Sequence, residues 1–231
     1  MRLYDDIIIP DFIENIVNSI KDTLNIDNYT DMGNGTFRAN LSDTGRLQNY
    51  YFVTINNISY QISSVVEDTS FIFTSASEPA TKSLTTKINY IHGDPVDIKN
   101  DLLKTATKDK EPIVALFEPI VETTNSNIDE TEYVSTDLWL AFCKPYAESW
   151  TTDEHYTYAI APMRALWRDF LLALKKKEGA EIISVGNYSL SSHSKYGLWN
   201  RRSGHTDSVL QKVSGVEITD FNINLSKKYS C

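Results

Sequence analysis

The sequence predicts an α+β fold, in which a mixed or antiparallel sheet is covered by an N-terminal amphipathic helix and a long helix over about 152–177, with hairpin arms and extended loops. Two observations carry this prediction. The stretch from Asp137 to Lys177 has the pattern of a buried strand followed by the longest amphipathic helix of the chain. Short β-rich runs separated by turn residues stand on both sides of it.

The strand of this central stretch is the continuous apolar run 137–143, after which Pro145 cannot donate to a ladder. The helix is expected to begin near Thr152, because Thr151 and Glu154 stand at capping-box spacing. Its apolar residues recur at i, i+3, i+4 and i+7, which predicts one buried face: Met163, Leu166, Trp167, Phe170, Leu171 and Leu174.

Pro162 lies inside this helical pattern. A proline removes one backbone hydrogen bond, so we expect a kink near Tyr158 or a break into two segments. The three lysines 175–177 suit the carbonyl end of the helix, and Gly179 supplies a stop.

The N-terminal part of the chain is predicted to hold one helix and several hairpins. Asp11 opens the helix, whose apolar stripe is Phe12, Ile13, Ile16, Val17, Ile20 and Leu24. Asn56-Asn57 predicts a two-residue hairpin turn between strands. The expected strands are 36–41, within a polar loop over 31–49, then 50–55, 58–66, 70–74 and 84–91, with an exposed insertion over 76–81 around Pro79.

The later part is predicted to close the sheet. Asp94-Pro95 launches a short helix, and the run 113–121 forms a hairpin with 137–143 and carries a bulge or edge at Glu118-Pro119. The acidic connection 122–135 is either an extended arm or a disordered tip. Three further strands are expected at 181–190, 195–200 and 216–225, the last bulged at Asp220. We therefore predict a core domain over 1–180 and a β-rich C-terminal extension over 181–231, packed on or added to it.

Charge and composition exclude several classes of protein. A formal net charge of -9 argues against a protein that wraps nucleic acid, because that binding needs clustered Lys and Arg. No apolar run approaches the roughly 20 residues of a membrane span, and no signal peptide is predicted, so synthesis in the cytosol is expected. The two cysteines, Cys143 and Cys231, form no disulfide framework and suit a reducing compartment.

The histidines and Cys143 are weak candidates for chemistry, so we predict no catalytic, metal or cofactor site. His92 precedes Gly93 and is more simply the end of a strand than half of a metal site. His155 follows two acids in a first helical turn, where capping and dipole roles are favoured over acid–base catalysis. Cys143 on a buried strand would have a raised pKa and is expected to pack in the core.

Two segments are candidate partner-binding surfaces. The acidic connection supplies Asp129, Glu130 and Glu132. The second segment combines aromatic and basic residues: Tyr196, Trp199, Arg201 and Arg202. This second set could contact a protein partner, could bind nucleic acid by stacking on bases and contacting phosphates, or could lie on a solvated hairpin. Because the net charge is -9, a protein partner is favoured over nucleic acid.

The order of these elements resembles the head-to-tail connector and tail-terminator proteins found in the neck of tailed bacteriophages. The residues that carry the resemblance are Pro112-Ile-Val-Ala-Leu-Phe-Glu118, Leu138-Trp-Leu-Ala-Phe142 and the helix from Trp150 to Ala173, about a third of the chain. The resemblance implies a non-enzymatic virion protein, assembled in the host bacterial cytoplasm. It would form a homo-oligomeric ring around the DNA channel and dock to other neck or tail proteins.

The region after Gly179 departs from the family pattern and leaves the docking surface open. In this interpretation DNA passes nearby without specific binding, and no membrane or cofactor is involved. Two hypotheses of other classes remain: a small cytosolic enzyme using His and carboxylate chemistry, and a soluble adaptor protein that binds a host protein.

Overall fold

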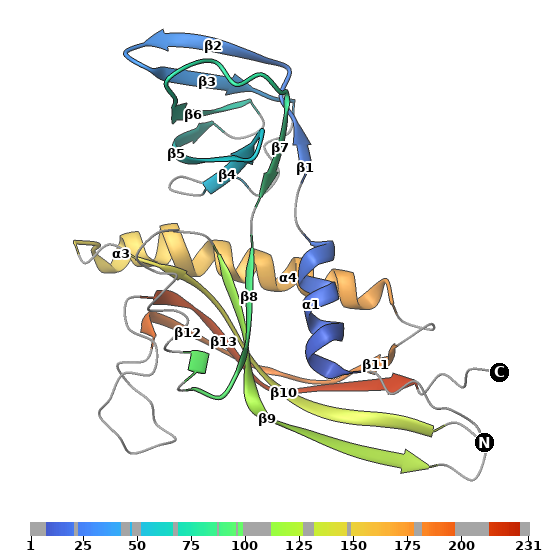
Figure 1. Ribbon diagram of the computed structural model, residues 1–231. Helices are drawn as coiled ribbons and strands as arrows, with labels where there is room; N and C mark the ends of the chain where they lie inside the picture. The colour runs from blue at the N-terminus through green and yellow to red at the C-terminus, as the bar shows by residue number, and fades with distance from the viewer. Residues whose placement is uncertain are drawn as a thin grey trace, which may run out of the picture.

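The computed structural model describes residues 8–20, 23–42, 47, 52–66, 69–86, 88–95, 97–98, 112–126, 132–146, 149–177, 182–196 and 213–226. It has a mixed α+β fold, as the sequence predicts, but its strands form two sheets instead of the single sheet expected. Figure 1 shows one sheet curled into a small barrel at the top and a larger sheet along the lower side, with the longest helix between them.

The barrel is a seven-stranded antiparallel sheet with the order β1-β7-β4-β5-β6-β3-β2. Phe71 and Phe73 of β6 are fully buried in its interior. Its strands are β1 (Thr23–Asn25), β2 (Asn28–Gly33), β3 (Thr36–Asn40), β4 (Phe52–Ile55), β5 (Ile58–Val66), β6 (Ser70–Thr74) and β7 (Ser83–Thr86).

The two strands at the ends of this sheet, β1 and β2, follow one another in the chain, and this closes the barrel. Ile26 N donates to the Lys82 carbonyl beside β7 at 2.7 Å, and Asp27 N donates to the Asn40 carbonyl of β3 at 2.8 Å. The Tyr29 hydroxyl adds a bond to the Thr81 carbonyl at 2.7 Å. The two ends of the curled sheet are thus joined through the chain, while β2 pairs with β3 alone among the described strands.

The larger sheet has the order β11-β13-β10-β9-β8, and β12 also pairs with β13. It is mixed, because β8 pairs parallel with β9 while the other ladders are antiparallel. The strands are β8 (Asn89–Gly93), β9 (Ile113–Ser126), β10 (Glu132–Pro145), β11 (Ile182–Val185), β12 (Ser189–Tyr196) and β13 (Val213–Ser226).

The helices are α1 (Ile9–Ser19) and a long one in three parts, α3 (Thr152–His155), the π-helical η1 (Tyr156–Ile160) and α4 (Ala161–Lys175). The predicted capping box is present: Glu154 N donates to Thr151 Oγ1 at 3.3 Å, and Thr151 N donates to Glu154 Oε2 at 2.7 Å. The π segment directly before Pro162 confirms the predicted interruption, which widens the helix instead of ending it.

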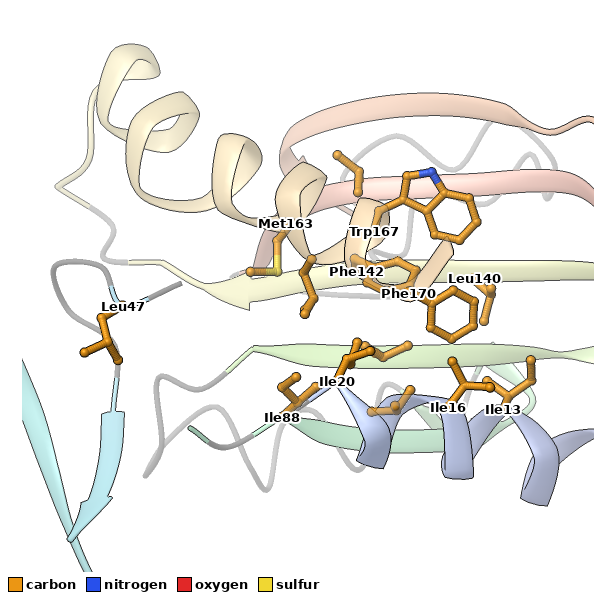
Figure 2. Packing of buried hydrophobic residues seen from close by; sticks show 14 of the residues in the cluster. Ile13, Ile16, Ile20, Leu47, Ile88, Leu140, Phe142, Met163, Trp167 and Phe170 are labelled. Carbon is orange, nitrogen blue, oxygen red and sulfur yellow. The ribbon is translucent and has the colours of Figure 1, made fainter. Parts of the chain in front are cut away.

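One face of the larger sheet, here called the inner face, packs against both helices. Phe142 of β10 meets the Trp167 and Phe170 rings of α4 edge-on at centroid distances of 5.4 and 5.5 Å. Figure 2 shows Ile13 and Ile16 of α1 on the other side of this aromatic group. Buried residues of the barrel belong to the same core cluster, so the two sheets share one apolar interior.

The opposite, outer face of the sheet carries a second, smaller core. Ala141 and Cys143 of β10 lie there with Phe117 of β9 and Val213 of β13, beneath Ile98. At Gly215 the backbone of β13 comes so close to β10 that a side-chain Cβ would clash with the Phe142 carbonyl and lie 2.7 Å from Cys143 Cα. Glycine is therefore required at this point of the ladder.

Several sequence predictions are confirmed. Asn56 and Asn57 form the hairpin turn with φ of 51° and 62°, and the insertion around Pro79 is largely exposed. The register shifts between β9 and β10 opposite Glu118-Pro119. A second shift falls where Asp220 adopts φ 56°.

Others need correction. The run 84–91 is two strands, β7 and β8, that belong to different sheets. The first helix begins at Ile9, with Pro10 in its first turn, and Leu24 lies on β1 instead of on the helical stripe. The loop predicted from 31 begins as the strand β2, which turns at Asn34-Gly35 into β3. Helix N-capping is seen at Asp94, whose Oδ1 accepts from Asp97 N at 2.9 Å; the rest of that predicted helix lies outside the described residues.

Strands on both sides of the predicted boundary at residue 180 share one sheet. β13 pairs with β10 from Tyr133↔Ser226 to Pro145↔Val213. The C-terminal strands thus extend the sheet that β9 and β10 begin, while the sequence between α1 and β8 is the segment that folds into a separate sheet.

Candidate functional site

The most prominent projecting feature is the part of β9 and β10 beyond β8, here called the arm, residues 118–126 and 132–137. β8 pairs with β9 only as far as Gly93↔Phe117. Beyond that point β9 runs on to Ser126 with β10 as its only partner among the described strands. At about 3.3 Å per residue, the eight residues after Glu118 extend roughly 26 Å past β8.

The outer face of the sheet along the arm is polar, and its side chains are tied to each other. Asn222 Nδ2 donates to Ser135 Oγ at 2.8 Å and to Asp137 Oδ1 at 3.0 Å. Asn224 Nδ2 donates to Ser184 Oγ at 2.8 Å on the neighbouring strand. The first two bonds join the β10 half of the arm to β13, and the third joins β13 to β11.

The exposed residues of the arm combine acids with one large apolar side chain. Glu118, Glu122 and Asp137 are exposed, and Val121 between them is 56 % exposed. The segment 118–137 contains six Asp and Glu and neither Lys nor Arg. The described exposed surface of the arm is therefore acidic, with one apolar side chain among the carboxylates.

The predicted partner-binding residues fall at two distant places. Glu132 begins β10 at the tip of the arm, opposite Ser126. Tyr196 ends β12 opposite Val213, which itself pairs with Pro145 at the other end of β10. The backbones of Glu132 and Tyr196 are thus separated by about 13 residues of strand, on the order of 40 Å. Asp129, Glu130, Trp199, Arg201 and Arg202 lie outside the described residues.

His155 is buried in a polar cluster, not in a catalytic arrangement. Its Nδ1 lies 2.7 Å from Ser214 Oγ, and the Ser214 hydroxyl donates its proton to the Ser194 carbonyl. Since a hydroxyl has one proton, the His155 Nδ1 must donate and cannot act as a base toward Ser214. Both side chains are nearly inaccessible, 2 % and 0 % exposed, so this pair lacks an attacking serine.

Lys144 is fully buried beside this cluster. Its Nζ donates to the Tyr158 carbonyl at 3.4 Å. That carbonyl belongs to the π-helical segment, where the regular helical bonding pattern is interrupted. The interaction anchors the long helix to the end of β10.

Two other histidines pair with carboxylates. His92 Nε2 lies 3.1 Å from Glu118 Oε1 at the base of the arm, and Gly93 then ends β8, as the strand-end interpretation of His92 predicts. His193 Nε2 lies 3.1 Å from Glu217 Oε2, whose other oxygen accepts from Trp139 Nε1 at 2.7 Å. This second pair, which sequence reasoning missed, links β12, β13 and β10.

Cys143 has the character of a core residue. It is fully buried, and burial raises the pKa of its thiol to about 12. A thiol that stays protonated at neutral pH is a poor nucleophile, as the sequence predicts. Among the described residues, no three His, Cys, Asp or Glu side chains gather in a way that could hold a metal ion.

A second charged surface lies on α4, and the sequence reasoning saw only its last turn. Arg168, Lys175 and Lys176 are exposed on this side, whereas Arg164, one turn before Arg168, is half-buried and donates from Nη2 to Ser192 Oγ at 2.9 Å. The signal that finds it is the spacing i, i+4, i+11 and i+12 on one helix, because those positions share a face.

No helix that the structure describes is long and apolar enough to span a bilayer. Comparison of the chain with protein-family models, with curated proteins and with solved structures found no match.

Proposed function

We propose that this protein is a non-enzymatic structural subunit that assembles with copies of itself into a ring in the neck or tail of a tailed phage, joining neighbouring components around the DNA channel. The observation that carries the proposal is the β9 edge of the arm, which carries exposed Glu122 and Val121 and runs beyond β8 while the β10 half of the arm pairs with β13. The phage setting rests on the family resemblance of 112–118, 138–142 and 150–173.

The arm supports self-assembly because of its edge. From Ile120 to Ser126 the side of β9 away from β10 meets no other described strand. This segment contains no Pro, Lys or Gly, the residues that commonly protect exposed edges. An unprotected edge of this length suits a strand or surface supplied by a neighbouring subunit.

The acidity of the chain suits a channel subunit that DNA passes without specific binding. With a net charge of -9, the surface as a whole repels the phosphate backbone. Docking to other neck and tail proteins would then involve protein surfaces, for which the arm and the segment around Tyr196 are the candidates.

The test is native mass spectrometry of the purified chain across a concentration series, with negative-stain imaging of the higher species. A closed ring of defined subunit number is the expected result. A monomer at every concentration, combined with absence of the protein from purified phage particles, would overturn the proposal.

One observation favours a second candidate, a small enzyme: His92 Nε2 lies 3.1 Å from Glu118 Oε1 at the base of the arm without forming a hydrogen bond to it, which leaves both groups available to a ligand. His92→Gln separates the two functions. It should leave ring formation unchanged if the pair is structural, whereas an enzyme would lose turnover of any substrate found by metabolite screening.

A further inference from the structure

Arg164 joins the first turn of α4 to the edge of the larger sheet. Its Nη2 donates to Ser192 Oγ of β12 at 2.9 Å. Ser192 pairs with Val216, which is buried in the core of the inner face, so Ser192 lies on that face too. Among the described strands β12 pairs with β13 alone, which makes it an edge strand at this level. The half-buried guanidinium is thus fixed between the helix and the rim of the sheet.

Most donors of this guanidinium have no protein partner. An arginine side chain presents several N–H donors in a planar fork. Arg164 Nε is buried and forms no hydrogen bond, and the bond to Ser192 is the only one that the fork makes with a described residue. Taking polar donors out of water without partners costs free energy. Anchoring α4 needs a single donor, which a lysine would supply, so anchoring alone does not explain a half-buried arginine here.

Arg168 brings a second guanidinium to the same place. It stands one helical turn after Arg164, and residues at this spacing share a face. Helical side chains lean toward the N-terminus, so the exposed Arg168 side chain extends over the turn that carries Arg164. Asp169, the one acid of residues 161–177, forms no ion pair with either arginine, and neither does any other described carboxylate. Two positive charges therefore stand together without a counter-charge in the described part of the chain.

This set of groups fits a phosphate dianion. A terminal phosphate carries about two negative charges at pH 7 and has several strong acceptor oxygens. Two guanidiniums balance that charge, and their forks bond phosphate oxygens bidentately. The Ser192 hydroxyl accepts from Arg164, and its own proton is engaged with no described residue, so it can donate to a further oxygen. A carboxylate or an internal phosphodiester of DNA carries a single charge and would leave one cation unbalanced.

We infer that Arg164, Arg168 and Ser192 form a binding site for a terminal phosphate group, either free inorganic phosphate or the phosphomonoester of a small molecule. The site lies on α4 and β12, neither of which belongs to the arm, so it does not depend on the proposed assembly. Bound phosphate would join the long helix to the edge strand and stabilise the folded protein by mass action.

Isothermal titration calorimetry at constant ionic strength tests the site, with sodium phosphate and phenyl phosphate as probes and acetate as the singly charged comparison. Both phosphates should bind more tightly than acetate, and phosphate should shift the NMR signal of the Arg164 Nε–H group. Binding should weaken below about pH 6, where the phosphate takes up a proton. Tighter binding of phenyl phosphate would identify a phosphorylated small molecule as the ligand, whereas equal affinities would identify free phosphate as sufficient.

Three substitutions separate the fork from general charge. Arg164→Lys keeps the charge but removes the fork, so phosphate binding should weaken about tenfold or more through the lost bond to a charged group. Arg168→Gln should weaken binding to a similar degree without lowering the melting temperature, because Arg168 is exposed. Lys175→Gln is the matched control, since Lys175 is an exposed cation on the same helix about two turns beyond Arg168. It should leave the affinity unchanged.

A wild-type protein that binds neither phosphate, or binds acetate as tightly, would overturn the site. Full affinity in both arginine variants would overturn it too, as would an equal loss in Lys175→Gln, because any cation of the helix would then serve. If Arg164→Lys lowers the melting temperature of the ligand-free protein, Arg168→Gln alone decides. Ring formation is followed separately by native mass spectrometry in phosphate-free buffer, so failure of the site leaves the proposed function standing.

Discussion

The barrel and the larger sheet are built by different kinds of contact. In the barrel, three of the six neighbouring pairs join consecutive strands, namely β2–β3, β4–β5 and β5–β6. In the larger sheet, β13 lies between β10 and β11 and bonds to a strand that ends 68 residues before it begins. The barrel therefore depends on local turns, whereas the larger sheet depends on distant strands finding the right register.

The connections between the two units are close together. β1 and β7, the first and last strands of the barrel, pair directly through Thr23↔Thr85. The chain thus passes from α1 into the barrel and from the barrel into β8 at neighbouring points, which is the geometry of an inserted module. The difference in contacts implies that damage to the larger sheet should leave barrel structure behind.

The largest expected effect is that of Gly215→Val. The new side chain would clash with the backbone of β10 at Phe142 and Cys143, so the free energy of unfolding should fall by more than about 4 kcal/mol. Two-dimensional NMR should show dispersed signals from barrel residues such as Phe73 while signals of β10 and β13 collapse.

Gly33→Ala is the matched glycine change in the barrel. The ideal Cβ there meets nothing within 4 Å, but φ is 85°, so the expected cost is only about 1 kcal/mol. Loss of the barrel signals together with the sheet in the Gly215→Val protein would show that the barrel has no independent stability.

The next largest expected effect is the loss of stability when a buried phenylalanine is truncated in either region. Phe170→Ala removes a ring packed between α4 and β10, and Phe73→Ala removes one from the barrel interior. Each should cost roughly 3–5 kcal/mol. Native-state hydrogen exchange should localise the Phe73→Ala loss to β3–β6, while Phe170→Ala weakens protection in β9, β10 and β13.

An unchanged melting temperature in the Phe170→Ala protein would contradict the assignment of the inner face. Leu171→Ala is the control on the same helix, because Leu171 is only partly buried. It should cost clearly less than Phe170→Ala.

The contrast between the two regions also explains what sequence could predict. Patterns that depend on neighbours were found: the Asn56-Asn57 turn, the capping box at Thr151 and the bulge at Asp220. Strand order was not, because nothing local in 84–91 shows that β7 and β8 belong to different sheets. The His193–Glu217–Trp139 group was missed for the same reason, since its members are far apart in the chain.

A smaller effect concerns the start of the long helix, and it depends on pH. Thr151→Ala should cost about 1 kcal/mol, because it removes the side-chain acceptor for Glu154 N. Bonds from Thr151 lower the pKa of the Glu154 carboxyl below its usual value. A lowered pKa in the folded state stabilises the protein above the unfolded pKa of about 4.3, and that contribution is lost as the pH falls through the folded value.

Urea unfolding at pH 7 and at successively lower pH checks this linkage. Glu154→Gln should reduce stability slightly at pH 7 and make it less sensitive to acid. A Glu154→Gln protein with an unaltered acid profile would show that the capping box does not persist in solution.

The smallest expected effect is a gain, and it is confined to the barrel. Asn57 has φ 62° in a two-residue turn whose second position favours glycine, so Asn57→Gly should relieve the left-handed strain. The added freedom of glycine in the unfolded chain offsets part of the benefit, leaving a net gain of about 0.5 kcal/mol. Asn57→Ala, which cannot adopt this φ cheaply, should lose about 1 kcal/mol instead. If the two regions unfold separately, both substitutions should alter hydrogen-exchange protection only in β3–β6. Equal changes of protection in β10 and β13 would mean that the shared core joins the barrel and the larger sheet into one cooperative unit.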